Sequence, residues 1–127
     1  MANQNLKKIL VVEDEKPLAK AMNLKLTKEG FEVFVAHSAE DGLKIIESEK
    51  IDLILLDILL PKMNGIEFLK KLREDDAHKD ILIIILSAFG DMEKVADAVE
   101  RGVYIYLIKD QTKIDDLVNT VKEKLSV

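Results

Sequence analysis

The stretch Leu53-Ile54-Leu55-Leu56-Asp57 is the most informative segment of this chain of 127 residues. Four consecutive apolar residues end here in a carboxylate. A strand with one face in water alternates polar and apolar residues, whereas a strand covered on both faces is apolar throughout. The stretch therefore predicts a strand of a parallel sheet, buried on both faces, that leads directly into an acidic residue.

Similar apolar runs recur along the chain and alternate with segments in which apolar residues have helical spacing. The runs predict strands at Lys8–Val12, Phe31–Ala36, Asp52–Leu56, Ile81–Leu86 and Val103–Ile108. Helical spacing is clearest in Leu18–Leu26, Ala39–Ile46, Met92–Val99 and Ile114–Leu125. Pro17 suits a first helical turn, Ser38 an N-cap, and Gly30 the left-handed residue that follows a helix.

The alternation of strand and helix, repeated five times, predicts an α/β fold with right-handed crossovers. We expect a flavodoxin-like, doubly wound sheet of five parallel strands with five helices. The strand order 2-1-3-4-5 follows from the general behaviour of such folds and not from particular residues. Ligands of these folds bind at the carboxyl ends of the strands, near the switch point between strands 1 and 3.

Composition narrows the classes of function. The net charge of −5 argues against a broad surface for nucleic acid or membrane. The absence of cysteine excludes disulfides, thiolate metal sites and thiol catalysis. The two histidines, His37 and His78, have no second ligand at useful spacing and are interpreted as surface or capping residues.

The length and the first residues suggest a soluble, cytoplasmic protein. The first apolar run is too short for a signal sequence or a membrane span. No linker or repeat is visible, so we expect a single domain over residues 1–127, with its core at about 7–125 and no effector domain.

Polar residues directly follow four of the predicted strands, so the fold would gather them at one edge of the sheet. Glu13 and Asp14 follow the first strand, Asp57 the third, Ser87 the fourth and Lys109 the fifth. Taken singly, they are more simply explained as solvated loop acids, a turn serine and a surface lysine. Three carboxylates at adjoining strand ends, however, need a cation, and oxygen ligands favour Mg²⁺, with Mn²⁺ as a substitute.

This combination of groups predicts transfer of a phosphoryl group to an aspartate. Asp57 would be the nucleophile, while the metal and Lys109 neutralise charge on the phosphoryl oxygens. The hydroxyl of Ser87 would hydrogen-bond one of those oxygens. The resulting acyl phosphate would be a labile, transient mark.

The residues at these positions resemble those of a known family, the response-regulator receiver domains of two-component signalling. The resemblance runs from about Lys7 to Leu125 and rests on five elements in the family's order and spacing. These elements are Val11–Glu15, Asp57–Gly65, Ser87-Ala88, Gly102, and Tyr106 with Lys109.

The resemblance implies a role for each residue of the site. Asp57 would be the phosphoacceptor and also a metal ligand. Asp14 would bind Mg²⁺ directly, Glu13 would do so through water, and the backbone carbonyl of Leu59 would be a further ligand. Lys109 would pair with Asp57 or with the phosphoryl group.

The resemblance also implies a switch and a set of partners. Ser87 and Tyr106 would move on phosphorylation and alter the face formed by the fourth helix, fifth strand and fifth helix. A sensor histidine kinase or phosphotransfer protein would supply the phosphoryl group, and a downstream target protein would read it. We expect a monomer or weak dimer without direct nucleic-acid or membrane contact. It would be no enzyme beyond its own phosphorylation and dephosphorylation.

Three alternatives remain at the level of sequence. In the family, proline usually follows the strand 5 lysine, but Asp110 follows Lys109 here, so a degenerate receiver acting only by protein contact is one alternative. An aspartate-nucleophile phosphatase would need a second carboxylate two residues after Asp57, where Leu59 stands. A flavodoxin-like FMN carrier would need a phosphate loop rich in Gly, Ser or Thr in place of the acids after the first strand.

Overall fold

The structure, a computed structural model, describes residues 6–57, 60, 63, 65–87, 105–109 and 112–125; the side chains of Ser87, Ile105 and Tyr106 lie outside the description. Its strands are β1 (Lys8–Val12), β2 (Glu32–Ala36), β3 (Leu53–Asp57), β4 (Leu82–Ser87) and β5 (Ile105–Ile108). Its helices are α1 (Lys16–Lys28), α2 (Ala39–Ser48), α3 (Gly65–Arg73), the short 3₁₀ helix η2 (Asp76–His78) and α5 (Ile114–Leu125).

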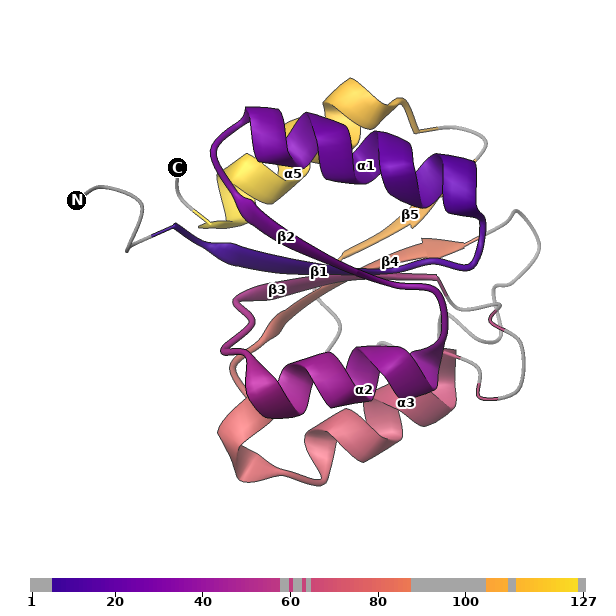
Figure 1. Cartoon of the computed structure of the whole chain (residues 1–127), viewed down its shortest axis with the longest axis vertical. Coiled ribbons are helices and arrows are strands. Elements are labelled where there is room, and N and C mark those ends of the chain that lie inside the picture. Colours follow the sequence, from indigo (N-terminus) through magenta and orange to yellow (C-terminus); the bar gives the residue numbers. More distant parts are fainter. Residues whose placement is uncertain are drawn as a thin grey trace.

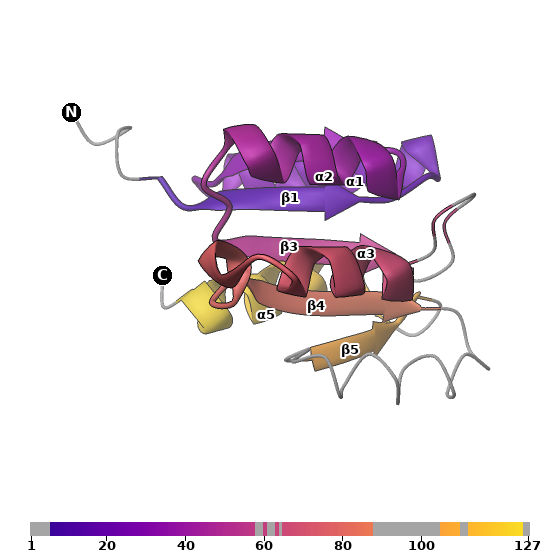
Figure 2. The ribbon, with the colours of Figure 1, turned by 90° about the horizontal axis from the view of Figure 1, so that it is seen from below.

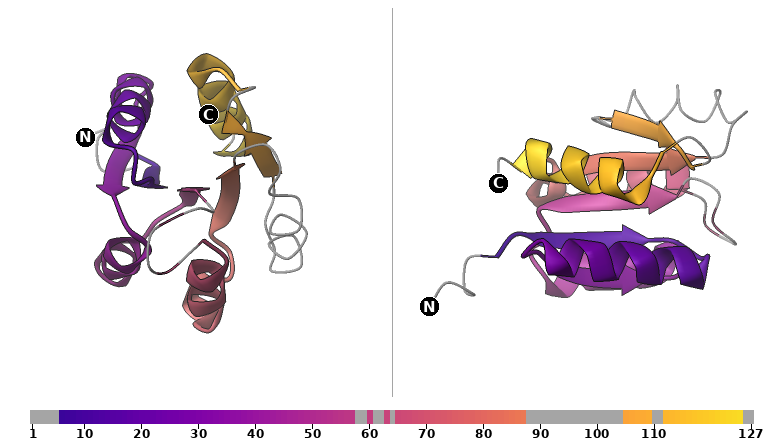
Figure 3. Two further views of the ribbon diagram at one scale, coloured as in Figure 1. Left: turned by 90° about the vertical axis from the view of Figure 1, so that its right-hand side faces the viewer. Right: turned by 90° about the horizontal axis from the view of Figure 1, so that it is seen from above.

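The five strands form one parallel sheet in the order β2-β1-β3-β4-β5, which confirms the predicted topology. Helices α1 and α5 cover one face of the sheet, and α2 and α3 cover the other (Figure 1). The end-on view in Figure 3 separates these two layers. The expected helix around Met92–Val99 lies outside the described residues.

The strands all point the same way, so their carboxyl ends meet at a single edge of the sheet (Figure 2). β3 and β4 each begin and end one residue later than the apolar runs predicted. The reason is that the β3–β4 ladder continues to the pair Asp57 and Leu86, so Asp57 belongs to the strand itself. The carboxylate is therefore held by sheet geometry and not by a loop.

The apolar runs are continuous because alternate side chains enter two separate cores. Leu10, Ile54 and Ile83 belong to the cluster beneath α2 and α3. Their chain neighbours Ile9, Leu53 and Ile84 belong to the cluster beneath α1 and α5. Each strand is thus buried on both faces, as the sequence pattern predicted.

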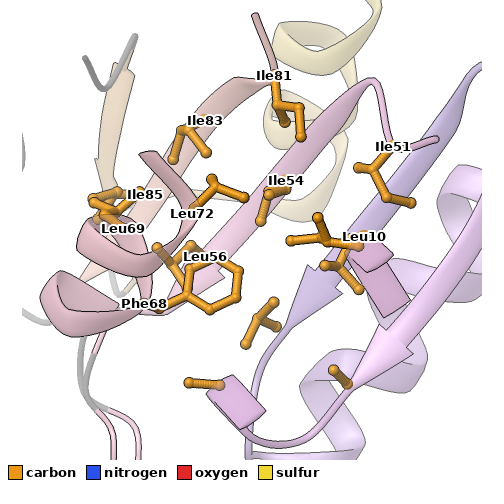
Figure 4. Close-up of a cluster of buried hydrophobic side chains, with 14 of the residues drawn as sticks. Leu10, Ile51, Ile54, Leu56, Phe68, Leu69, Leu72, Ile81, Ile83 and Ile85 are labelled. Atoms are coloured by element: carbon orange, nitrogen blue, oxygen red, sulfur yellow. The ribbon is translucent and has the colours of Figure 1, made fainter. Parts of the chain in front are cut away.

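Close packing of α2 and α3 fixes one side of the sheet. A Cβ atom added to Gly42 would lie 3.1 Å from the Phe68 ring and 3.2 Å from the Val12 side chain, so the glycine lets α2 approach closely. Figure 4 shows Phe68 of α3 beside Leu56 of β3 within this core.

Local signals at the helix ends agree with the sequence. Pro17 lies in the first turn of α1, and Gly30 follows that helix with a φ of 99°, which glycine adopts at low cost. The hydroxyl of Ser38 accepts a hydrogen bond from the Asp41 N–H, as an N-cap residue does. Within the described part of the chain, every helix is too short or too polar to cross a bilayer.

Replacing Phe68 with alanine tests the packing of α3 on the sheet. Phe68 is fully buried. The Phe68→Ala variant is therefore expected to lose about 3–5 kcal/mol of unfolding free energy, measured by urea titration. The control is Leu24→Ala on α1, whose side chain is 62% exposed and which should change stability by no more than about 0.5 kcal/mol. Similar losses in both variants would contradict the assigned core.

Candidate functional site

Asp57 is the last residue of β3 and lies at the carboxyl edge of the sheet. Its side chain is only 4% exposed. An ionised carboxylate so deep in the fold needs charged or hydrogen-bonding partners, because burial removes most of its water. Lys109, which directly follows β5, is such a partner.

Glu13 follows β1 and is even more deeply buried, at 1% exposure. Two contacts with the end of β2 hold the backbone of Glu13. The Glu13 N–H donates to the Ala36 carbonyl at 2.9 Å, and the Glu13 carbonyl lies 3.0 Å from His37 Nδ1. Its carboxylate accepts a hydrogen bond from the backbone N–H of Glu15 at 3.1 Å. These contacts fix the carboxylate beside the end of β3.

The predicted metal-binding acids do come together. Glu13, Asp14 and Asp57 each offer a carboxylate oxygen, and these three oxygens lie within 4.8 Å of one another. Asp14 is exposed, while the other two are buried, so the cluster opens to solvent on one side. Such an arrangement can hold a cation that arrives from solution.

Lys109 directly follows β5 and crosses the ends of the strands to reach this cluster. Its Nζ lies 2.9 Å from Asp57 Oδ2, 2.9 Å from Glu13 Oε1 and 3.1 Å from Glu15 Oε2. The lysine side chain is 17% exposed. The ammonium therefore bridges β1, β3 and β5, and the substitution of Asp110 for the family's proline does not prevent Lys109 from reaching Asp57.

The electrostatics of the cluster follow from its burial. Burial raises the pKa of Glu13 to about 7, although hydrogen bonds from Lys109 and the Glu15 N–H oppose the shift; the nearby charge of Asp57 adds to it. Burial would lower the pKa of Lys109, but its hydrogen bonds to Asp57 and Glu13 outweigh that effect and raise the pKa above its usual value. Lys109 is thus firmly protonated, while burial keeps the pKa of Glu13 raised in spite of that neighbouring charge.

The chemistry of the cluster fits a hard divalent cation. Lys109 contacts the carboxylates of Glu13, Glu15 and Asp57, and the carboxylate of Asp14 lies beside those of Glu13 and Asp57. Glu13 Oε1 is buried and accepts no hydrogen bond of good geometry, although Lys109 Nζ lies 2.9 Å away. An oxygen in that position would gain from a cation or from the water bound to one.

Several predicted site residues cannot be placed. Leu59, whose backbone carbonyl was expected to bind the metal, lies outside the described residues, as does Asp110. Ser87 ends β4 and Tyr106 lies within β5, so their backbones are at the expected strands, but their side chains are not described. Their switch roles remain predictions.

Two residues outside the predicted site set also take part in the site. Glu15 contacts Lys109, which is 94 residues away in the chain, and a contact at that separation leaves no local signal. His37 is exposed, and its ring nitrogen lies at hydrogen-bond distance from the Glu13 carbonyl, which agrees with its interpretation as a surface or capping residue. The contact with Glu13 itself appears only when β1 and β2 are paired.

Comparison with known proteins identifies the family. Residues 9–122 match the response regulator receiver domain. Sporulation initiation phosphotransferase F of Bacillus subtilis is 34% identical over 118 residues, which are 93% of each chain. The transcriptional regulatory protein AfsQ1 of Streptomyces coelicolor is 37% identical over 101 residues, which are 80% of this chain and 44% of that protein.

A solved structure gives the same result. The CheY-like receiver domain protein of Methanospirillum hungatei is 34% identical, with a TM-score of 0.85 over 96% of this chain and 95% of that one. The chain therefore belongs to the response regulator receiver domain family and is a receiver domain of two-component signalling. These findings favour the receiver over the flavin carrier and the phosphatase that the sequence left open.

The raised pKa of Glu13 predicts how stability depends on pH without metal. Between pH 4.5, the usual pKa of this side chain, and about 7, the folded state holds a proton that the unfolded state releases. Stability should therefore fall as the pH rises through this window, by about 3 kcal/mol for this group. Urea unfolding in EDTA at pH 4.5 and pH 7.5 should show the fall in the wild type and a smaller one in Glu13→Gln.

The exposed Glu47→Gln on α2 is the matched control for removing one negative charge. It should keep the wild-type dependence on pH. Parallel stability curves for Glu13→Gln and the wild type would contradict the assignment of this titration to Glu13.

Proposed function

We propose that the chain accepts a phosphoryl group on Asp57 and that Mg²⁺ bound by Glu13, Asp14 and Asp57 supports the transfer. The observation that carries the proposal is the meeting of these three carboxylates with the ammonium of Lys109 at one edge of the sheet. We further propose that the whole chain, with its core at about 7–125, forms one receiver domain.

Asp57 supplies the nucleophile. A carboxylate oxygen attacks the phosphorus of the donor, and the bond between phosphorus and the donor's leaving atom breaks, its electron pair remaining with the donor. The strand position of Asp57 keeps the attacking oxygen fixed, which lowers the entropic cost of the encounter.

Lys109 supplies fixed positive charge at the same place. Its Nζ already lies 2.9 Å from Asp57 Oδ2, so it can stabilise a phosphoryl oxygen after only a small movement. When bound, Mg²⁺ would neutralise charge on the phosphoryl oxygens and on the surrounding carboxylates. Asp14, exposed and acidic, would take the cation from solvent, and Glu13 would complete the site from its buried position.

Partners follow from the family. A histidine kinase or a phosphotransfer protein would be the donor, and a downstream protein would read the face that includes β5 and α5. Ser87 and Tyr106 would link Asp57 to that face, and the carbonyl of Leu59 would be a further metal ligand. A relative that matches over nearly its whole length is named a phosphotransferase, which supports passage of the phosphoryl group to another protein.

Asp57→Asn tests the acceptor. The amide cannot attack phosphorus, so the variant should show no Mg²⁺-dependent mass increase with acetyl phosphate, whereas the wild type gains one phosphoryl group by intact mass spectrometry. Asp41→Asn, which changes an exposed acid on α2, is the control and should label like the wild type. Equal labelling of Asp57→Asn and the wild type would refute the assignment, and failure of the wild type to label would favour a degenerate receiver.

Asp14→Asn tests the metal site. Loss of one anionic ligand should weaken Mg²⁺ binding about tenfold or more, measured by calorimetric titration at neutral pH. The same Asp41→Asn control should bind Mg²⁺ with unchanged affinity, because its carboxylate lies on α2 and takes no part in the cluster. Unchanged Mg²⁺ affinity in Asp14→Asn would contradict the assignment of the metal site to this cluster.

A further inference from the structure

The contacts of Lys109 give Glu15 a distinct part in the site. A lysine ammonium has three N–H donors. Nζ of Lys109 donates to Asp57 at 2.9 Å, to Glu13 Oε2 at 3.2 Å and to Glu15 at 3.1 Å. Each donor thus has its own carboxylate. When Asp57 carries a phosphoryl group, the donor that faced Asp57 can turn to that group, but a second donor becomes available to it only if Glu13 or Glu15 releases one.

The two acceptors that stay unmodified differ in what their release costs. Glu13 is 1% exposed, so its carboxylate would be left buried without this cation. The Glu15 side chain is 61% exposed and can return to water at little cost. Glu15 also lies outside the group of three acids that can share a metal ion. It is therefore the partner that Lys109 can exchange.

The backbone of Glu15 is fixed independently of its carboxylate. Glu15 is the N-cap residue of α1, and its carbonyl accepts the N–H of Ala19 at 2.9 Å. The Glu15 N–H donates a hydrogen bond to the carboxylate of Glu13. Its side chain makes no capping hydrogen bond, unlike that of Ser38 on α2. The Glu15 carboxylate accepts a hydrogen bond from Lys109 and none from the first turn of α1.

We propose that Glu15 is a positioning residue that holds the third donor of Lys109 in the resting protein and yields it to a phosphoryl oxygen when Asp57 is modified. This proposal rests on the proposed function of Asp57. Glu15 stabilises the resting position of the Lys109 ammonium and competes with the phosphoryl group for its hydrogen bond.

The test compares Glu15→Gln with the wild type in binding beryllofluoride, a phosphoryl mimic, with Mg²⁺ present. The neutral amide is a weaker acceptor for an ammonium, so the variant should bind about two- to fivefold more tightly, the range expected for an exposed ion pair. Glu47→Gln, which removes a charge from the exposed surface of α2, should bind like the wild type. Unchanged or weaker binding by Glu15→Gln would overturn the proposal.

Removing a negative charge would also reduce general repulsion of the anion, and a double-mutant cycle separates the two effects. If Glu15 acts through Lys109, Glu15→Gln should change nothing in a Lys109→Met background. If Glu15→Gln tightened beryllofluoride binding to the same extent in the Lys109→Met background, the proposal would be overturned, and general repulsion of the anion would explain the effect.

A second measurement needs neither metal nor phosphoryl mimic. Hydrogen exchange of the Lys109 ammonium, followed by nitrogen-15 NMR, should be faster in Glu15→Gln than in the wild type and in Glu47→Gln. Equal exchange would show that Glu15 does not hold the donor. If the wild type neither labels nor binds beryllofluoride, the proposed function itself fails, a result separate from any difference between the variants.

Discussion

The ion pair of Lys109 with Glu13 and Asp57 is the interaction on which the site depends. Two carboxylates lie almost fully buried at adjoining strand ends, and within the described residues this ammonium is the cation that contacts both. Removing one partner from such a cluster leaves uncompensated buried charge, at a typical cost of about 3–5 kcal/mol. The cluster also links the ends of β5, β1 and β3 at the carboxyl edge of the sheet.

The sheet makes this meeting possible. Parallel strands bring their carboxyl ends to one edge, and the register places Val12, Leu56 and Ile85 side by side, one or two residues before Glu13, Asp57 and Ser87. Apolar residues on both faces keep the strands in place beneath α1 and α5 on one side and α2 and α3 on the other. A rigid sheet can therefore hold like charges together that a loop would allow to separate.

The cluster carries more carboxylates than Lys109 can neutralise. One ammonium offsets part of the negative charge. The pKa of Glu13 stays raised, chiefly because its carboxylate is buried and to a smaller extent because of the charge of Asp57. A divalent cation would supply the missing charge, and a phosphoryl group would then draw on Lys109. The exposed carboxylate of Glu15 gives the lysine a partner that is easily exchanged, so the same charges serve both the resting and the modified states.

The strands, their parallel arrangement and the residues at their ends could be predicted from the apolar runs. Buried strands must be apolar, and Glu13, Asp14, Asp57 and Lys109 follow such runs. The runs missed the last residue of β3 and of β4, since ladder hydrogen bonds extend past the apolar run. The bridging of three acids by Lys109 and the contacts of His37 and Glu15 with the site are seen only in the folded chain. Those contacts connect residues far apart in the chain, and their geometry depends on strand register and side-chain reach, which no local pattern encodes.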